Sequence, residues 1–112
     1  MSARRGEVWL VDFGEAVGRE QAGIRPALVA SADRLNESPA GVLMVVPITS
    51  ARRGLPSHIE IDAAGSGLDH ASYAKCEDLE SISERRLVHR VGAAGPAVMA
   101  AGEQVRRYLL DL

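Results

Sequence analysis

The sequence predicts a mainly β (α+β) fold, a small β-barrel capped by a C-terminal α-helix. Short runs rich in β-branched and aromatic residues recur between residues 7 and 92, separated by turns that contain Gly or Pro. From Pro96 the pattern changes to apolar residues spaced by three and four, which is typical of an amphipathic helix. Several short strands followed by one helix indicate a barrel with a helical cap. Without repeats or linkers, residues 1–112 are expected to form a single domain.

The three longest predicted strands lie in the first half of the chain. Residues 7–13 place Trp9 on one face with two other apolar side chains, and Trp9 is expected in the core. Residues 24–31 form the second strand, where Pro26 restricts the first residues to an edge or a bulge. Residues 41–48 are apolar on both faces, which predicts a central strand. The connection 14–23 is long and polar, a kind of loop that is often functional.

Shorter elements follow the central strand. Residues 58–61 alternate and predict a short strand, residues 71–79 resemble another, and residues 88–92 form the last. Residues 83–87 predict a single capped helical turn. In the final helix we expect one apolar stripe, made of Val98, Ala101, Val105, Leu109 and Leu112.

Two further features of the helix can be read from spacing. Glu103 and Arg107 are four residues apart and can pair on the outer face. Gly102 costs about 1 kcal/mol relative to Ala inside a helix, which close packing against the sheet would explain.

Composition limits the functional classes. No stretch approaches the roughly 18–20 apolar residues that span a membrane, and no apolar signal region follows Met1, so a cytoplasmic protein is expected. The single cysteine, Cys76, fits a reducing compartment. The scattered cysteine and histidines give no zinc spacing, so neither a metal nor another cofactor is expected. The net charge of −2 argues against a general basic coat and predicts few phosphate contacts.

Arg25 and Thr49 are the most informative pair. Arg25 begins one predicted strand, and Thr49 ends the next. If these strands are antiparallel neighbours, the start of one lies beside the end of the other, and both side chains can face one phosphate. A guanidinium binds phosphate through several donors and keeps its charge. Taken singly, Arg25 could be a surface arginine beside a turn and Thr49 a strand terminus; together they predict a protein that acts on phosphodiesters.

Other polar residues are weaker candidates. Lys75 and Glu77, two apart on a predicted strand, share one face with Tyr73, and they fit either a cross-sheet ion pair or part of the same cleft. Arg52 and Arg53 fit a solvated loop or contacts to neighbouring phosphates. Glu20 and Gln21 are polar loop residues. His58, His70 and His89 show no partner in the sequence and are interpreted as structural or solvated.

Four segments in order resemble the MazF/PemK toxin family, the mRNA interferases of bacterial type II toxin–antitoxin systems. The segments are residues 6–9, 18–29, 46–50 and 76–83, and their ordered spacing covers nearly the whole chain. The resemblance implies an SH3-like β-barrel with a C-terminal helix, a homodimer, and an endoribonuclease that cleaves single-stranded mRNA at short sequences without metal. It also implies 2′-OH attack on the phosphodiester, with a cyclic phosphate and a 5′-OH as products, and neutralisation by a MazE-like antitoxin with an acidic tail.

The resemblance also assigns residues by position. Arg25 and Thr49 match the catalytic arginine and threonine of the family, and Ser50 a neighbouring hydroxyl. Lys75 and Glu77 fall where some members place an arginine and an aspartate, and Glu20 matches an implicated loop glutamate. Ile24 departs from relatives that carry a histidine there, and Lys75 lacks the planar fork of an arginine.

The resemblance leaves the proton-transfer groups open. Glu77 is the candidate general base if burial raises its pKa, because an arginine is a poor base. We expect base recognition by the loops 15–23 and 50–57, including Glu20, Gln21, Arg52 and Arg53, with Tyr73 as the stacking platform.

The alternative function is a non-enzymatic toxin of the same fold that binds a protein target such as DNA gyrase. Those relatives act through a C-terminal Trp-Gly-Ile tail. Residues 109–112, Leu-Leu-Asp-Leu, do not match that tail.

Overall fold

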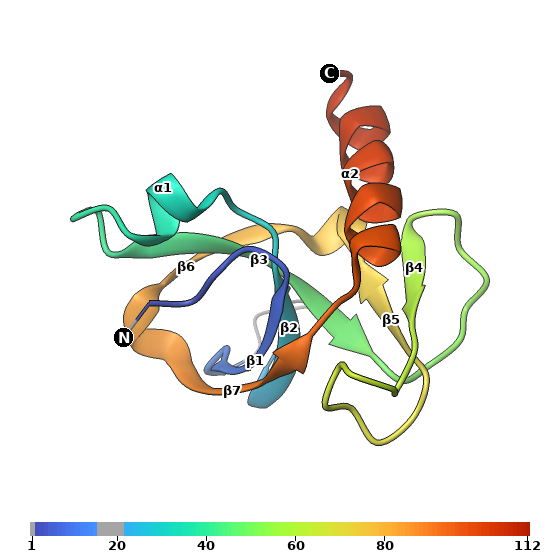
Figure 1. Cartoon of the computed structure of the whole chain (residues 1–112), viewed down its shortest axis with the longest axis horizontal. Coiled ribbons are helices and arrows are strands. Elements are labelled where there is room, and N and C mark those ends of the chain that lie inside the picture. Colours follow the sequence, from blue (N-terminus) through green and yellow to red (C-terminus); the bar gives the residue numbers. More distant parts are fainter. Residues whose placement is uncertain (1, 16–21) are drawn as a thin grey trace.

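The computed structural model describes residues 2–15 and 22–112, in which seven strands and a C-terminal helix are the main elements (Figure 1). The strands are β1 (Glu7–Asp12), β2 (Ile24–Val29), β3 (Val42–Thr49), β4 (His58–Ile61), β5 (Ser72–Lys75), β6 (Glu80–Ser83) and β7 (Leu87–Ala93). The helices are α1 (Asp33–Asn36), α2 (Pro96–Leu110) and two 3₁₀ turns, η1 (Cys76–Asp78) and η2 (Glu84–Arg86). The predicted mainly β fold with a C-terminal helix is confirmed.

Strand β3 is the centre of the sheet. The strand order is β4-β5-β3-β2-β1-β7, and these neighbouring strands are antiparallel. On the side away from β2, β3 pairs with β6 from Val42 to Val45 and with β5 at Ile48 and Thr49. Pro47 lies between the residues that pair with β6 and those that pair with β5. Its missing N–H therefore removes no hydrogen bond of the sheet on that side. The curled sheet therefore has β4 and β7 at its two ends, within the described residues, and forms an open barrel.

Two hydrophobic clusters lie on the two faces of the central strands. The inner cluster is Ala3, Trp9, Val11, Ala27, Val29, Leu43, Val45, Ile82 and Leu87. The helix-side cluster is Val8, Leu28, Val46, Ile48, Ile61, Ala74 and Met99. Successive side chains of a strand point to opposite faces, so β1, β2 and β3 each contribute to both clusters. This explains why residues 41–48 are apolar at nearly every position, and the expected burial of Trp9 is confirmed at 4% exposure.

Helix α2 packs against β4 and η1 and extends beyond the sheet (Figure 1). The predicted stripe is therefore only partly right: Val98, Ala101 and Val105 are half-buried, whereas Leu109 and Leu112 are exposed. Met99 and Gly102 are the buried residues of the helix.

Gly102 leaves room for a neighbouring side chain. A Cβ at this position would lie 2.9 Å from Nη1 of Arg106, so the glycine accommodates the guanidinium of the residue four positions later on the same helix. Glu103 does not take Arg107 as the partner expected from spacing; its carboxylate lies 3.6 Å from Nη2 of Arg5.

The predicted strand over residues 71–79 is wrong in its second half. Strand β5 ends at Lys75, and the backbone turns through η1 before β6 begins at Glu80. Since Glu77 lies on this 3₁₀ turn, it does not continue the alternation of Tyr73 and Lys75. The capped turn predicted at residues 83–87 is confirmed as η2, in which the Ser83 hydroxyl accepts from the Arg85 N–H.

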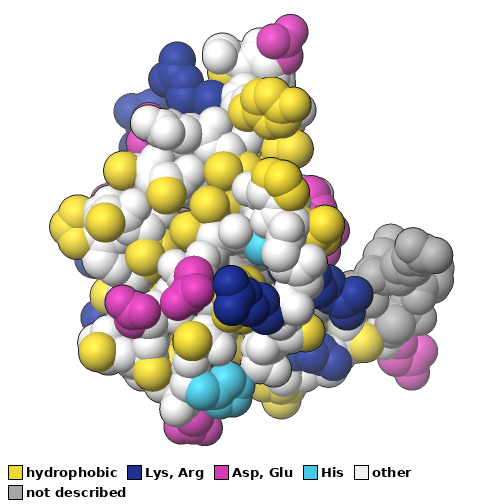
Figure 2. All heavy atoms as spheres, turned by 90° about the vertical axis from the view of Figure 1, so that its right-hand side faces the viewer, with side chains coloured by type: hydrophobic (Ala, Val, Ile, Leu, Met, Phe, Trp, Pro, Cys, Tyr) yellow, Lys and Arg dark blue, Asp and Glu magenta, His cyan; other side chains and the backbone are white. Residues whose placement is uncertain are grey.

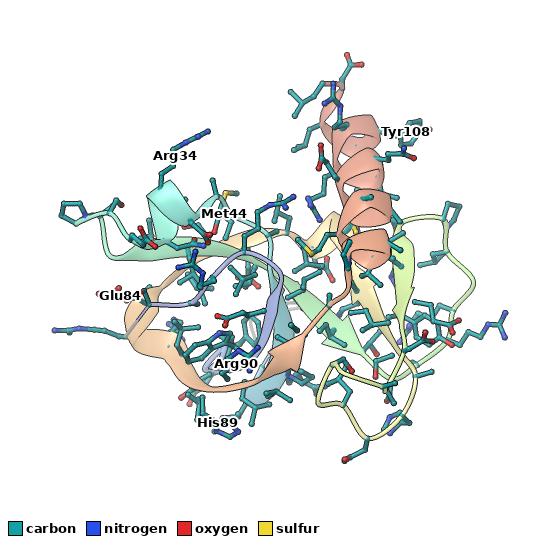
Figure 3. All side chains as sticks on the ribbon, in the orientation of Figure 1. Arg34, Met44, Glu84, His89, Arg90 and Tyr108 are labelled. Carbon is teal, nitrogen blue, oxygen red and sulfur yellow. The ribbon has the colours of Figure 1, made fainter. Side chains whose placement is uncertain are left out.

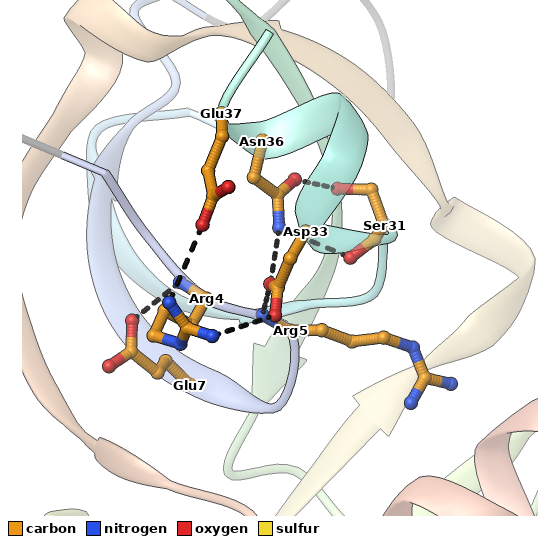
Figure 4. Close-up of polar contacts among 7 residues, drawn as sticks. All are labelled: Arg4, Arg5, Glu7, Ser31, Asp33, Asn36 and Glu37. Carbon is orange, nitrogen blue, oxygen red and sulfur yellow. Dashed lines mark hydrogen bonds and ion pairs between the residues drawn. The ribbon is translucent and has the colours of Figure 1, made fainter.

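A polar cluster ties the N-terminal arm to α1 (Figure 4). The Arg5 N–H donates to Asp33 Oδ1 at 2.7 Å, and Arg4 Nη2 lies 3.3 Å from Asp33 Oδ2. The N–H of Arg5 is the main cause that lowers the pKa of Asp33. Asn36, which is buried, donates to the Ser31 carbonyl at 3.2 Å and accepts from the Ser31 hydroxyl. These bonds satisfy polar groups that burial would otherwise leave unpaired.

Two glycines bring the loop between β4 and β5 onto β7. A Cβ at Gly67 would lie 2.1 Å from the Val91 carbonyl oxygen, and one at Gly92 would lie 2.1 Å from that of Ser66. Gly67 also has φ +80°, which favours glycine. Backbone therefore packs on backbone here, and the contact fixes where the following residues of the loop lie.

We expect Gly92→Ala to destabilise the fold by about 1–3 kcal/mol, because the added methyl overpacks a backbone contact that cannot yield. The measurement is the free energy of unfolding in urea. Gly95→Ala is the matched control, since no atom lies within 4 Å of its Cβ position and only a helix N-cap preference is lost. Equal stability of the two variants would contradict the close packing of the loop on β7.

Candidate functional site

A cavity of about 480 Å³ opens at one end of the sheet, at the point where β2 begins and β3 ends. Its apolar wall takes one residue from each of four strands: Leu10 from β1, Pro26 from β2, Ile48 from β3 and Val91 from β7. Its polar lining is Arg25, Thr49, Ser50, Asp69, His70, Ser72 and His89. One guanidinium, three hydroxyls, two imidazoles and one carboxylate thus gather over an apolar floor, and the guanidinium and hydroxyls can bind an anionic group.

The strand register explains why Arg25 and Thr49 meet. β2 and β3 are antiparallel, with Ala27 opposite Pro47. Continuing this register by two residues brings Arg25 level with Thr49, and residues opposite each other in a ladder share one face. Both side chains line the cavity, so the juxtaposition predicted from the sequence is confirmed.

Local hydrogen bonds orient the two groups. Arg25 Nε donates to the Ala22 carbonyl at 2.9 Å, which uses one of the five N–H donors of the guanidinium. Thr49 Oγ1 accepts from the Ala51 N–H at 3.1 Å, so the hydroxyl proton can still be donated to a ligand. Ser50, also predicted, is exposed at the rim.

Two histidines that the sequence interpretation set aside lie in the same cavity. His70 comes from the loop between β4 and β5, and His89 comes from β7. Neither has a motif around it, so spacing alone did not relate them to Arg25. The signal available was the glycine-containing loop at residues 62–70, which is only one residue shorter than the loop at residues 14–23.

Glu77 belongs to a different cluster. Its carboxylate accepts from the Ser57 hydroxyl at 2.8 Å and lies 2.9 Å from Nε2 of His58, whose side chain is 3% exposed. Burial acts to raise the pKa of Glu77, but the hydrogen bonds with Ser57 and His58 outweigh it and hold the pKa below its ordinary value. The condition for a base role, a raised pKa, is not met, and Glu77 is not among the residues that line the cavity. The expectation that His58 has no partner is also wrong.

The remaining predicted residues that the structure describes do not line the cavity. Tyr73 is half-buried and pairs with Thr49 across β3 and β5, while Lys75 Nζ lies 3.3 Å from Asp78 Oδ2. Arg52 and Arg53 are exposed on the loop that follows Ser50. Glu20 and Gln21 lie outside the described residues.

The surface charge is mixed. On the face seen in Figure 2, acidic and basic side chains lie close to each other among apolar ones, as the net charge of −2 suggests. Over residues 2–15 and 22–112, no group of three His, Cys, Asp or Glu side chains is arranged to hold a metal ion. No helix in the same part of the chain is long and apolar enough to cross a membrane.

Residues 4–109 match the family described as PemK-like, MazF-like toxin of type II toxin-antitoxin system. The chain belongs to this family. The membership predicted from the four sequence segments is therefore confirmed.

Individual relatives agree with the family assignment. The chain is 36% identical to Endoribonuclease MazF9 of Mycobacterium tuberculosis, with 97% of each protein covered. It is similar in structure to MazF of Deinococcus radiodurans, at a TM-score of 0.88 and 26% identity, covering 100% of this chain and 99% of that one. A MazE-MazF structure from Deinococcus radiodurans gives a TM-score of 0.83 at 25% identity, with 100% and 98% covered. The barrel-like fold expected of the MazF/PemK family is thus confirmed.

We expect the stabilising effect of Glu77 to depend on pH. A carboxylate whose pKa is lowered by folding stabilises the fold above its unfolded pKa, near the ordinary 4.5, and this contribution is lost as the pH falls through the folded value. Glu77→Gln should lower the melting temperature at pH 6–7, and the difference from wild type should shrink below about pH 4. Because the side chain is 36% exposed, solvent screening limits the effect to about 1 kcal/mol.

Thermal unfolding between pH 3 and 7 measures this dependence. Glu60→Gln, an exposed glutamate on β4 outside the cluster, is the matched control. A Glu77→Gln deficit that stays constant across the whole range would show that the carboxylate charge is not what stabilises the cluster.

Proposed function

We propose that this protein is a sequence-specific, metal-independent endoribonuclease toxin that cleaves single-stranded mRNA. Its membership of the PemK/MazF-like family and its relative named Endoribonuclease MazF9 support the enzyme class expected from the sequence. The observation that carries the proposal is the cavity in which Arg25 and Thr49 lie side by side at the ends of β2 and β3. A phosphodiester held there can be attacked by its own adjacent 2′-OH, giving a cyclic phosphate and a 5′-OH.

Arg25 is the group that stabilises charge in this reaction. The bond from its Nε to the Ala22 carbonyl directs the guanidinium, and the Nη groups form the fork that meets the non-bridging oxygens. Charge on these oxygens grows in the pentacoordinate transition state, so a donor fixed in advance lowers the barrier. The apolar wall of the cavity strengthens this interaction, because it excludes water from one side of the phosphate.

Thr49 and Ser50 hold the same phosphate. Thr49 Oγ1 accepts from the Ala51 N–H, and its own hydroxyl proton is free to be donated to a phosphate oxygen. Ser50 adds a second hydroxyl at the rim of the cavity.

The exposed loop that carries Arg52 and Arg53 leads directly away from Ser50, so it is placed to contact the nucleotides that flank the cut. Tyr73, beside Thr49 in the ladder, is the nearest stacking platform, and Glu20 and Gln21 complete the proposed base readout. Lys75 contributes positive charge near this edge of the sheet, although it pairs with Asp78.

A cognate MazE-like antitoxin and a homodimer complete the proposal. The MazE-MazF structure from Deinococcus radiodurans supports the first. The second is supported by the last turn of α2 and the residues after it, where Tyr108, Leu110 and Leu112 are 85%, 56% and 78% exposed. Single large apolar side chains are common on surfaces, but three within five residues indicate an interface. A cytoplasmic location follows from an mRNA substrate.

Arg25→Ala should reduce the rate of RNA cleavage by about 10²–10³-fold, since one preorganised donor to the transition state is lost. Thr49→Val, which keeps the shape and removes the hydroxyl, should also reduce the rate, and Thr49→Ser should restore most of it. The measurement is cleavage of a defined transcript in EDTA under single-turnover conditions, with the termini of the products identified.

Arg85→Ala is the matched control, because Arg85 is an exposed arginine on η2 that does not line the cavity. An Arg25→Ala protein that cleaves at the wild-type rate would contradict the assignment of the cavity. RNA that stays intact with wild-type protein would favour the alternative of a toxin that binds a protein target.

A further inference from the structure

The proposed reaction moves two protons, and neither Arg25 nor Glu77 is suited to move them. One proton must leave the attacking 2′-OH, and one must reach the departing 5′ oxygen. An arginine stays protonated at any physiological pH, so it is a poor base and a poor acid. Glu77 is held by Ser57 and His58 and does not line the cavity. The groups that transfer protons must therefore be other side chains of the cavity.

The cavity contains two imidazoles. We propose that His70 and His89 are the general acid–base pair for RNA cleavage, with Arg25 stabilising charge between them. The inference rests on the proposed function and adds the groups that move the protons. Histidine is the side chain whose charge ordinarily changes between about pH 5 and 8, so it serves both as proton acceptor and as proton donor near neutrality.

His89 is placed by the sheet. It lies opposite Leu10 on β1, and Leu10 lies opposite Pro26 on β2, so these three residues share the face that floors the cavity. Figure 3 shows His89 and Arg90 on opposite sides of β7, and Arg90 Nε bonds Glu7 Oε2 at 2.7 Å on the far side. Arg25, next to Pro26 at the start of β2, also lines the cavity, so His89 and Arg25 belong to one site although their strands are two spacings apart, roughly 10 Å.

His70 is placed by the loop between β4 and β5. The backbone contact of Gly67 and Gly92 fixes the loop on β7 two residues after His89. The His70 carbonyl accepts from the buried Ser72 hydroxyl at 3.1 Å, which anchors the other end of the loop to β5. His70 therefore lines the cavity from the loop, and His89 lines it from β7.

The charged groups that face the two imidazoles fit an acid–base pair. Arg25 on β2 and Asp69 on the loop are the other titratable residues that line the cavity. A guanidinium and a carboxylate therefore accompany the two imidazoles in the cavity.

The step balances without a further reagent. The neutral histidine accepts the proton of the 2′-OH as the 2′-oxygen–phosphorus bond forms. The bond from phosphorus to the 5′ oxygen breaks, and the protonated histidine gives its proton to that oxygen. The products are a 2′,3′-cyclic phosphate and a 5′-OH, and exchange with water restores both imidazoles.

Single-turnover cleavage of a defined transcript by the full chain, in EDTA and from pH 4.5 to 9, tests the pair. Wild-type protein should show a bell-shaped pH–rate profile. His70→Gln and His89→Gln should each lower the maximal rate by about 10²–10⁴-fold, and each should abolish one limb of the bell. Both imidazoles are exposed, so the variants are expected to fold, and melting temperatures check this.

Two controls separate a catalytic from a structural effect. Arg90→Gln changes the residue next to His89, and the Arg90 side chain faces away from the cavity. Asp62→Asn changes a residue on the loop of His70 that does not line the cavity. Both should keep the wild-type profile. If wild-type protein cleaves RNA but the histidine variants keep both limbs of the bell, the pair is wrong and the proposed function stands; if wild-type protein does not cleave, the proposed function itself fails.

A modified substrate assigns the two roles. With sulfur in place of the 5′ bridging oxygen, the leaving thiolate needs no proton, so the variant that lacks the acid should recover to within about tenfold of wild type, and the other should not. Recovery of one variant alone supports the pair. Recovery of neither shows that no histidine protonates the leaving group, and recovery of both shows that neither acts as the base.

Discussion

The register of β2 against β3 is the constraint on which the site depends. The apolar residues of both strands are buried on two faces, and a slip of one position would move every side chain to the wrong cluster. The same pairing that satisfies both clusters brings Arg25 level with Thr49. The hydrophobic effect thus sets the position of two polar groups that contribute nothing to the core. The geometry of the proposed site is therefore a consequence of apolar packing several residues away.

Much of the fold can be predicted from the sequence, because the positions of the strands and helices depend on local pattern. The apolar run of β3, the alternation in β4, the start of α2 at Pro96 and the cap at Ser83 each follow from periodicity or turn chemistry. The meeting of Arg25 and Thr49 could be predicted because it needs only one assumption, that consecutive strands pair antiparallel. The end of β5 at Lys75 could not, since residues 76–79 are apolar and polar in an order that suits either a strand or a turn.

The histidines and Glu77 show where local pattern stops being informative. His58 and Glu77 are nineteen positions apart and meet only because β4 pairs with β5 and η1 turns back toward it. His70 and His89 come together because the loop of His70 packs, backbone on backbone, against the strand of His89. In the sequence, two glycines are the only sign of this contact. Whether the leucines near the end of α2 are buried or exposed depends on how far the sheet extends beneath them, and helical periodicity does not contain this information.

The change of partner along β3 divides the molecule into two halves. Up to Val45 the strand belongs with β6 and the inner cluster, and from Ile48 it belongs with β5 and the helix-side cluster. The cavity takes Arg25 and His89 from strands of the first half and His70 and Ser72 from the second. If RNA binds in this cavity as proposed, its affinity is linked to the cooperativity of folding, because binding is lost whenever either half opens. The substrate would then stabilise the contact between the two clusters.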